Sequence, residues 1–216
     1  MSGAWQRAPA AARLGEAAAT LGLSLPAEAL ARLLDLCELL AAWATRMNLT
    51  GHRGPDAILD RLVLDALALG AALPAAARVA DLGAGAGLPG LPLAIARPEA
   101  SFTLVEARER RHHFQREAVR RLGLPRVVPL LGRAERLPAT PHDLVVAQAM
   151  GPAAEVAPLL LRWAAPGGCV AIPGSATPPE PGPVAGVEAA RIVSYRVPVT
   201  GVPRTLWIGR ACAGSR

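Results

Sequence analysis

The chain has 216 residues, of which 52% are hydrophobic, so a full core is expected and a disordered chain is not. All 23 basic residues are arginine, and the net charge of +6 suits an ordinary globular protein or one with a polyanionic partner. No apolar run is long enough to cross a membrane, and the N-terminus lacks the apolar stretch of a secretory signal. Three scattered cysteines, Cys37, Cys169 and Cys212, form neither a disulfide framework nor a metal pair. The sequence predicts a cytoplasmic protein without a metal site.

Residues 1–75 are predicted to form an N-terminal helical portion. Leucines at positions 30, 33, 34 and 40 recur at the spacing of one helix face, after a proline that suits a first helical turn. Residues 48–51 interrupt this pattern, Pro55 allows a second helix, and Pro74 ends it. We therefore expect helices before residue 76.

From about residue 76 onward, short apolar strands alternate with helices. The predicted strands are residues 78–82, 102–106, 127–131, 144–147 and 169–172, and the predicted helices are residues 89–96, 108–122 and 153–163. Residues 173–186 are rich in Pro and Gly and are predicted to be a loop, followed by an edge strand pair at 192–197 and 205–209. This order predicts an α/β fold, with a mostly parallel sheet covered by helices on both faces, in a domain of residues 76–216.

A glycine-rich loop carries the strongest chemical signal. It runs from Asp81 through Gly83, Gly85 and Gly87 to Gly90, after a predicted strand and before a predicted helix. Glycine adopts positive φ without strain and lets a ligand lie against the backbone. Because ligands of open α/β sheets bind beyond the carboxyl ends of the strands, the loop predicts a nucleotide-type site.

The residues around the loop favour S-adenosylmethionine over a dinucleotide. The spacing is G-x-G-x-G instead of the G-x-G-x-x-G of dinucleotide sites, and Asp81 would repel a pyrophosphate. The same carboxylate suits the cationic amino-acid end of S-adenosylmethionine. Glu106 ends the next strand, where an acid can accept hydrogen bonds from both ribose hydroxyls. We predict an S-adenosylmethionine site, with a nicotinamide site or a purely structural turn as the alternatives.

Residues after the third and fourth strands are candidates for the rest of the pocket. Ala134 and Glu135 follow the third strand, and Glu135 either contacts the adenine edge or lies in a solvated turn. Gln148 follows the fourth strand and would line the far wall, where it either orients a substrate base by hydrogen bonding or only forms the wall.

Four motifs follow one another along the chain. They are Asn48-Leu49-Thr50, Arg61 to Asp65, Asp81 to Gly90 with its continuation to Arg97-Pro98-Glu99, and Gly132 to Glu135. In this order they resemble the RsmG (GidB) family of bacterial 16S ribosomal RNA guanine-N7 methyltransferases. The run Leu-Pro-Gly-Leu-Pro-Leu within the third motif is much more specific than a generic glycine loop. The resemblance implies a class I (Rossmann-like) S-adenosylmethionine-dependent methyltransferase sheet with N-terminal helices.

The resemblance also implies roles for individual residues. Cofactor contacts are expected at Gly83, Leu88, Ala134 and Glu135, and the candidates for positioning the substrate near the active-site mouth are Asn48, Arg61 and Asp65. The chain departs from the family pattern where a His is replaced by Leu62, an Arg by His113 and by Gln148, and a Lys motif by one containing Pro173. These departures concern activity and RNA affinity and leave the predicted fold unchanged.

An RNA substrate gives a role to the basic residues. Nine of the 23 arginines lie between residues 108 and 136. The candidates for phosphate binding on the predicted helix are Arg108, Arg110, Arg111, Arg116, Arg120 and Arg121. Aromatic residues make up only 3% of the chain, so arginine would also have to stack on splayed bases. The alternative is a solvated helix face, and salt dependence of RNA binding would distinguish the two.

Methylation at guanine N7 needs no catalytic base, because N7 carries an exposed lone pair and no proton has to leave it. We therefore expect catalysis by positioning and nominate no base. The expected partner is small-subunit ribosomal RNA or its ribonucleoprotein particle, bound by a monomer. The alternatives are a non-catalytic RNA-binding or ribosome-binding module on a methyltransferase fold, and a methyltransferase with an acceptor other than ribosomal RNA.

Overall fold

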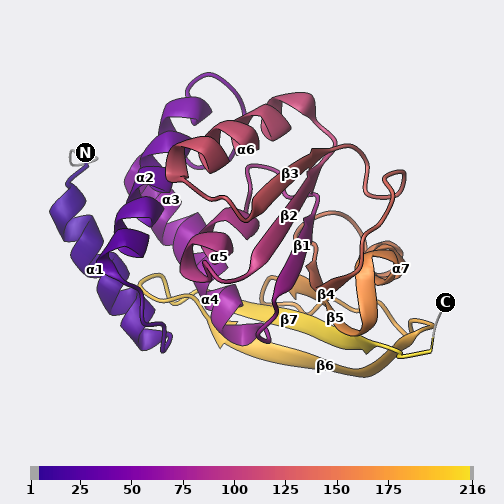
Figure 1. The fold of residues 1–216 in the computed structure, drawn as a ribbon. Coiled ribbons are helices and arrows are strands. Elements are labelled where there is room, and N and C mark those ends of the chain that lie inside the picture. The colour runs from indigo at the N-terminus through magenta and orange to yellow at the C-terminus, as the bar shows by residue number, and fades with distance from the viewer. Residues whose placement is uncertain (1–4, 215–216) are drawn as a thin grey trace.

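A computed structural model describes residues 5–214 as one seven-stranded sheet with helices packed against it (Figure 1). The strands are β1 (Arg78–Leu82), β2 (Ser101–Glu106), β3 (Val127–Leu131), β4 (His142–Val146), β5 (Ala164–Gly174), β6 (Val187–Arg196) and β7 (Pro203–Ala211). The helices are α1 (Arg7–Thr20), α2 (Ala27–Ala44), α3 (Pro55–Ile58), the π-helical turn η1 (Leu59–Val63), α4 (Leu64–Ala72), α5 (Gly90–Ala96), α6 (Glu109–Leu122) and α7 (Ala153–Trp163). Within residues 5–214, no helix has the length and apolar character needed to span a bilayer.

The sheet has the order β3-β2-β1-β4-β5-β7-β6. Strands β1 to β5 pair in parallel, whereas β7 pairs antiparallel with both β5 and β6. The chain moves outward from β1 to β2 and β3, and then returns to place β4 on the other side of β1. This reversal creates a switch point at the carboxyl ends of β1 and β4, where ligands of open α/β sheets bind.

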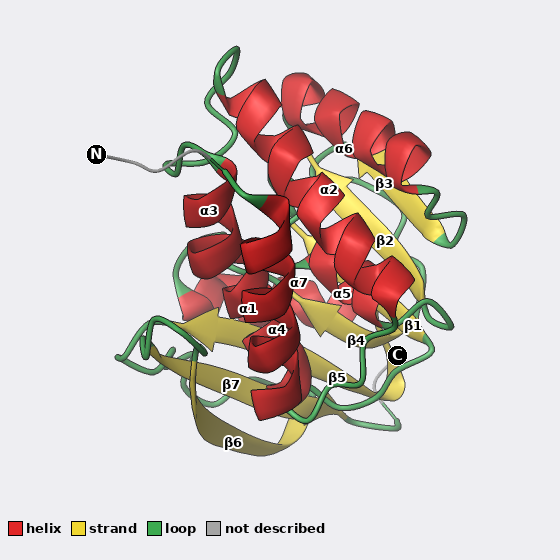
Figure 2. Ribbon diagram, turned by 90° about the vertical axis from the view of Figure 1, so that its left-hand side faces the viewer, coloured by secondary structure: helices red, strands yellow, loops and turns green. Residues whose placement is uncertain are grey.

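Helices cover both faces of the sheet. Figure 2 looks onto α1, α2 and α4 in front of one face, and Figure 1 shows α7 on the opposite side. On one face, α1, α2, α4, α5 and α6 share a core with Phe102 and Leu104 of β2 and Leu144 of β4. On the other face, α7 packs on Ala80 and Val145 with its Trp163 fully buried. The alternation of side chains along parallel strands supplies apolar groups to both faces, which is why the inner strands β1, β2 and β4 are mostly buried. The outer strand β3 is more exposed, at Val128 and Leu131.

The N-terminal helices share the core of the sheet domain. Leu14 of α1, Leu33 of α2 and Leu67 of α4 belong to the same buried cluster as Phe102 of β2. Helix α2 also contacts α5 and α6 directly. The division of the chain between residues 75 and 76 stays a prediction.

Arg97, in the continuation of the third sequence motif, connects α5 to the end of α4. Its guanidinium donates to the backbone carbonyls of Gly70, Leu73 and Pro74. These carbonyls are at and just after the C-terminus of α4, where helical C=O groups have no partner within the helix. The side chain therefore fastens the end of α4 to the end of α5.

The structure differs from the sequence prediction at the start of β5. The sequence predicts a strand only from residue 169, but β5 begins directly after α7, at Ala164. Ala164 pairs with His142, and the next paired residue is Cys169, opposite Leu144. The intervening residues form a bulge, in which a Cβ on Gly168 would lie 2.9 Å from two backbone carbonyl oxygens. The strand also extends to Gly174, beyond the predicted end.

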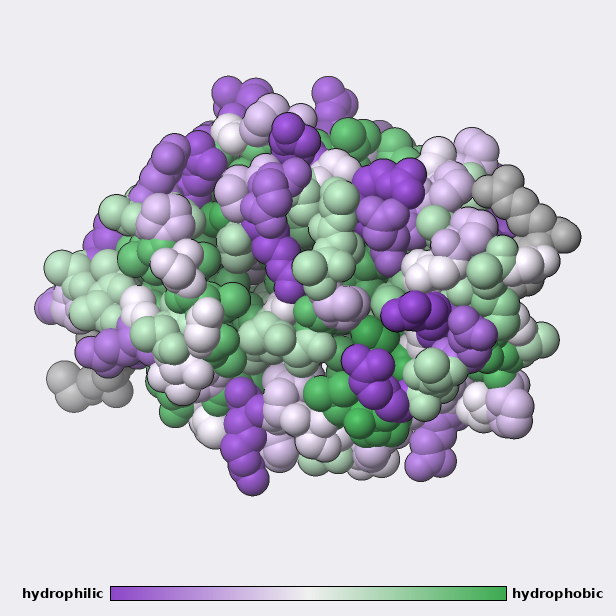
Figure 3. All heavy atoms as spheres, turned by 60° about the horizontal axis from the view of Figure 1, so that its bottom comes forward, coloured by the Kyte–Doolittle hydropathy of each residue, from purple (hydrophilic) through white to green (hydrophobic). Residues whose placement is uncertain are grey.

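The antiparallel strands β6 and β7 form the predicted edge pair. The underside of the molecule in Figure 1, which comes forward in Figure 3, carries hydrophilic and hydrophobic residues side by side. The edge strand β6 bears Glu188, Arg191 and Arg196, all exposed. Charged side chains on an edge strand oppose pairing with another chain.

We predict that Phe114→Ala lowers the free energy of unfolding by about 3–5 kcal/mol. Phe114 is completely buried beneath α2, with its ring edge-on to Trp43 at 5.4 Å between centroids. Val128→Ala is the control, since 52% of Val128 is exposed, and its effect is expected within about 0.5 kcal/mol. Urea unfolding measures both variants, and equal effects would contradict this account of the core.

Candidate functional site

The glycine loop between β1 and α5 adopts the conformation that its sequence predicts. Gly83, Gly85 and Gly87 have φ values of +70°, +56° and +76°, in the left-handed region that glycine adopts without strain. Ala84, between them, donates its N–H to the carbonyl of Val105 on β2 at 2.9 Å. The loop is thereby anchored to the neighbouring strand and folds across the carboxyl end of β1.

Asp81 is buried at the base of this loop. Its Oδ2 accepts a hydrogen bond from the backbone N–H of Gly90 at 2.9 Å, and its Oδ1 has no partner within the described residues. A Cβ on Gly90 would lie 2.3 Å from Leu104 and 2.9 Å from the Asp81 carboxylate, so only glycine lets α5 approach this closely. Burial raises the pKa of Asp81 to about 7; the Gly90 bond opposes the shift, and the charge of Glu106 adds to it.

Glu106 connects the glycine loop to α6. Its Oε2 accepts the N–H of Gly85 at 2.9 Å, and its Oε1 accepts the N–H of Arg108 at 2.7 Å. Arg111 approaches the same carboxylate at 4.0 Å, and the Glu106 side chain is 6% exposed. The structure therefore places the two acids expected at the cofactor, Asp81 and Glu106, on adjacent strands beside the loop.

Gln115 is a site residue that the sequence analysis missed. Its Nε2 donates to the carbonyl of Gly85 at 2.9 Å from a fully buried position on α6, and its Oε1 has no partner among the described residues. Phe114, Ala118 and Leu122 share its buried face. A polar residue within that apolar stripe was the available signal.

The turn after β3 is held by backbone contacts. Gly132 donates its N–H to the Glu106 carbonyl at 3.0 Å, which ties the turn to the end of β2. The carbonyl of Ala134 accepts from the Trp163 indole at 3.2 Å, and that of Glu135 accepts from Arg162 at 2.7 Å. The Glu135 side chain is exposed, whereas Ala134 is buried. Both residues thus lie in a turn fixed at its two sides.

The segment after β4 lies against the glycine loop. A Cβ on Gly83 would be 3.2 Å from the Met150 side chain, so these residues are in close contact. Gln148 is half-buried at the end of β4, and Ala149 has a φ of +52°. Met150 belongs to the segment of residues 148–152 that the sequence predicts for the far wall, and its flexible thioether can adapt to a ligand.

The three positioning candidates lie in three different environments. Asn48 lines a pocket of about 540 Å³ with residues 108–111 at the start of α6. Asp65 is 8% exposed and forms an ion pair with Arg204 of β7, with distances of 2.9–3.1 Å. Arg61 is exposed on η1, one position before the half-buried Leu62. The structure therefore places Asn48 beside α6. It pairs Asp65 with Arg204, which is 139 positions away and which no local pattern links to it.

The six arginines on and before α6 fall into separate groups. Arg120 and Arg121 both pair with Glu117, at 2.9 and 2.6 Å, and these contacts lower the pKa of that carboxyl to about 2. The first three, Arg108, Arg110 and Arg111, line the pocket shared with Asn48. Arg116 lines a neighbouring pocket of about 360 Å³. The sequence analysis treated these six arginines as one surface, and the structure divides them.

Known proteins match both the sequence and the fold. The sequence profile of the family described as "rRNA small subunit methyltransferase G" matches residues 29–178. The chain belongs to this family. A Ribosomal RNA small subunit methyltransferase G from Azoarcus sp. (strain BH72) is 44% identical over 142 residues, 65% of this chain and 67% of that protein. One from Methylobacillus flagellatus is 35% identical over 188 residues, 86% of this chain and 91% of that protein.

The fold agrees with the family assignment. An apo S-adenosylmethionine-dependent methyltransferase, SibL, aligns with a TM-score of 0.55 and 21% identity, over 69% of this chain and 55% of the SibL chain. The predicted RsmG family, the methyltransferase assignment and the class I fold are confirmed. The individual roles of the site residues stay predictions.

We predict that Asp81→Asn changes how the stability of this family member depends on pH. The folded-state pKa of about 7 lies above the ordinary 3.8, so ionising the buried carboxyl costs the wild type stability as the pH rises from about 4 to about 7. The Asn variant lacks this decline, which urea unfolding across that range measures.

Asp143→Asn is the control. Arg78 lowers the pKa of Asp143, so the stability that the ionised Asp143 carboxylate contributes is lost as the pH falls, opposite in direction to the effect of Asp81. Parallel pH profiles for the wild type and Asp81→Asn would refute the buried-carboxyl assignment.

Proposed function

We propose that this chain transfers a methyl group from S-adenosylmethionine to N7 of a guanine in small-subunit (16S) ribosomal RNA. The observation that carries the proposal is the pair of buried carboxylates, Asp81 and Glu106, on either side of the glycine loop at the switch point. Membership of a ribosomal RNA methyltransferase family supports the choice of acceptor.

The loop and its acids fit the charge and shape of S-adenosylmethionine. Asp81 Oδ1 is buried without a partner in the described chain, so it can accept from a cationic amino group. Glu106 uses its two oxygens for the N–H groups of Gly85 and Arg108, and carboxylate oxygens can accept further bonds from ribose hydroxyls. A pyrophosphate, by contrast, would face two acids.

We assign the remaining contacts by position along the sheet edge. The backbone of Gly83 and Gly85, together with Leu88, would lie against the cofactor, as predicted from the sequence. Ala134 and Glu135 would contact the adenine edge, since the exposed Glu135 carboxylate is available to its amino group. The half-buried Gln148 would form the opposite wall with Met150.

Catalysis in this proposal is mainly positioning. S-adenosylmethionine, when bound, supplies a methyl group on a cationic sulfonium. The N7 lone pair of guanine would attack the methyl carbon in line as its bond to sulfur breaks, leaving a neutral thioether. The product base would carry the positive charge without losing a proton from N7. No residue has to act as a base, so the chain orients the two reactants and can supply up to about 7–11 kcal/mol in this way. The Gln148 amide can hydrogen-bond the base without a proton transfer.

The partner in this proposal is small-subunit ribosomal RNA or its ribonucleoprotein particle, bound by a monomer in the cytoplasm. Asn48, Arg61 and Asp65 would position the substrate from the N-terminal helices. The Asp65–Arg204 pair holds α4 against β7, so Asp65 would act through the placement of α4. The departures from the family pattern at Leu62, His113, Gln148 and Pro173 leave the two cofactor acids unchanged.

Transfer of labelled methyl to deproteinised and particle-bound small-subunit RNA, followed by nucleoside analysis, tests the proposal. We expect labelled 7-methylguanosine. Gly83→Arg should abolish it, because the new side chain must displace Met150, and Glu106→Ala should reduce transfer roughly tenfold or more. Gly22→Arg is the matched control, since Gly22 has the same φ of +70° in open space.

Absence of label despite cofactor binding measured by calorimetry would reject the ribosomal RNA acceptor. Absence of cofactor binding as well would favour the non-catalytic module. A wild-type rate of methyl transfer in Gly83→Arg would show that the glycine loop does not contribute to the reaction.

The pH dependence of cofactor binding provides a second test. If Asp81 receives the cationic amino group, binding favours the ionised carboxylate, and affinity for S-adenosylmethionine rises as the pH increases from about 5.5 toward about 7. Calorimetry should show this rise in the wild type and in Asp143→Asn, and a weaker, flat profile in Asp81→Asn. A flat wild-type profile would show that Asp81 does not face the amino group.

A further inference from the structure

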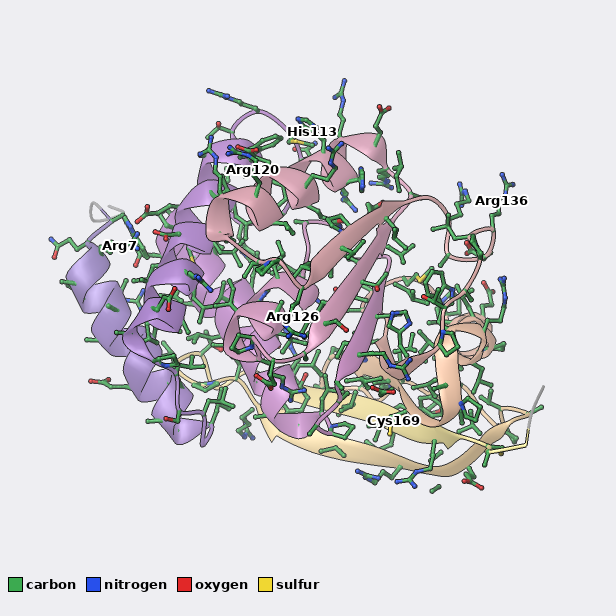
Figure 4. The ribbon with its side chains drawn as sticks, viewed as in Figure 1. Arg7, His113, Arg120, Arg126, Arg136 and Cys169 are labelled. Carbon is green, nitrogen blue, oxygen red and sulfur yellow. The ribbon has the colours of Figure 1, made fainter. Side chains whose placement is uncertain are left out.

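Two adjoining pockets lie between the end of α2 and the first turns of α6, outside the cofactor loop. The first has a volume of about 540 Å³ and the second about 360 Å³, and both are lined by Met47, Glu109 and Arg110. They therefore form one continuous groove, which we call the α2–α6 groove. Figure 2 shows α2 and α6 side by side, and Figure 4 labels His113 and Arg120 on α6.

The first half of the groove is strongly basic. Its charged residues are Arg46 and Arg53, from the segment between α2 and α3, and Arg108, Glu109, Arg110 and Arg111, from the start of α6. Within residues 5–214, only Arg111 of these arginines forms a salt bridge, with Glu106 at 4.0 Å. Unpaired guanidinium groups on two facing segments suit a phosphate, which arginine can bind with two parallel hydrogen bonds.

The second half of the groove presents a flat ring and apolar side chains. Trp43 is held from below by the buried Phe114, 5.4 Å away edge-on, and lies 5.8 Å from the ring of His113. Met47 and Leu131 complete the apolar lining, and 45% of Leu131 is exposed. A fixed aromatic ring beside apolar groups and arginine is the kind of surface on which unpaired bases stack.

His113 has a place in this arrangement. His113 stands where the RsmG family pattern commonly has an arginine. In the structure its imidazole is exposed beside Trp43, with the two rings tilted by 51°, so an aromatic ring stands where the family pattern has a guanidinium. The departure therefore extends the stacking surface of this chain.

We infer that the α2–α6 groove binds a single-stranded segment of RNA, with successive backbone phosphates at Arg46, Arg53 and Arg108 and the adjoining base on Trp43 and His113. The inference rests on the proposed function for the class of partner and adds the place and the form of recognition. A duplex offers phosphates, but its bases are stacked and cannot reach a surface ring. Arg120 and Arg121 lie outside the groove and are already paired with Glu117.

The test uses the full chain and a fluorescently labelled, unstructured 12-nucleotide RNA in anisotropy titrations over a range of salt concentrations. Arg46→Gln/Arg53→Gln should weaken binding about tenfold or more and reduce the salt slope by roughly 1.4, the value for two contacts to a single strand. Arg191→Gln/Arg210→Gln is the matched control: these arginines are exposed on β6 and β7, form no salt bridge in the described chain, and remove the same charge. The control should stay within about twofold of the wild type.

Trp43 distinguishes stacking from charge. Trp43→Ala should weaken single-strand binding about tenfold and leave binding of a 12-base-pair RNA duplex unchanged. Because Trp43 packs on Phe114, Trp43→Phe is a second variant that keeps the packing. RNA should quench tryptophan fluorescence in the wild type, and this quenching should be lost in Trp43→Phe while binding is largely retained.

Equal losses in the two arginine pairs would mean that net charge alone attracts RNA, and would overturn the inference. Unchanged quenching in Trp43→Phe would do the same. These binding measurements need no methyl transfer, so the two proposals can fail separately. If the wild type methylates ribosomal RNA but the groove variants behave like the control, only the groove is rejected. If the binding pattern holds without methyl transfer, only the proposed reaction is rejected.

Discussion

The carboxylate of Glu106 is the contact around which the functional edge of the sheet is organised. It sits at the end of β2 and accepts backbone N–H groups from Gly85 on one side and Arg108 on the other. A buried carboxylate is stable only with such donors, and two unpaired backbone N–H groups are satisfied by the same side chain. The glycine loop and the entry to α6 are therefore fixed relative to each other by one residue.

The N-terminal helices complete this edge from outside the sheet. Their apolar faces continue the core that covers β2 and β4, and Arg97 fastens α4 to α5 through carbonyls at the helix end. The segment between α2 and α3 is thereby held beside α6, although it is separated from α6 by two strands in the sequence. A basic surface assembled from two segments depends on this packing and would not exist on either helix alone.

Much of the fold could be predicted from local pattern. Strands β1 to β4 and helices α5 to α7 match the predicted ranges within a few residues, because hydrophobic periodicity and glycine or proline boundaries are local signals. The start of β5 could not be predicted, since Pro166 and the two following glycines have the composition of a loop. In the structure they form a bulge, and the residues before and after it, Ala164 and Cys169, pair with β4. The π-helical turn η1 also lacks a local signal.

Residues of the candidate site could be predicted where they lie at the ends of predicted strands. Residues whose contacts are far away in the sequence could not. Asp81 and Glu106 lie beside the loop as their positions indicate. Gln115 was missed because its partner is a backbone carbonyl 30 residues away, and Arg204 because its partner Asp65 is 139 residues away. The pairing of Arg120 and Arg121 with Glu117 follows the three- and four-residue spacing of helix neighbours and was available from the sequence. The grouping of Arg108 and Arg110 with Arg46 and Arg53 depends instead on the packing of the segment after α2 beside α6.

The peptide group of Gly85 has a consequence for the modularity of this fold. The N–H of Gly85 donates to the carboxylate of Glu106. The C=O of Gly85 accepts from the side-chain amide of Gln115, in the second half of α6. The glycine loop is therefore not a transferable motif by itself. A graft of residues 83–90 onto another sheet would lack both supports, and the smallest unit that carries its own conformation runs from β1 through α5 and β2 into α6 as far as Gln115.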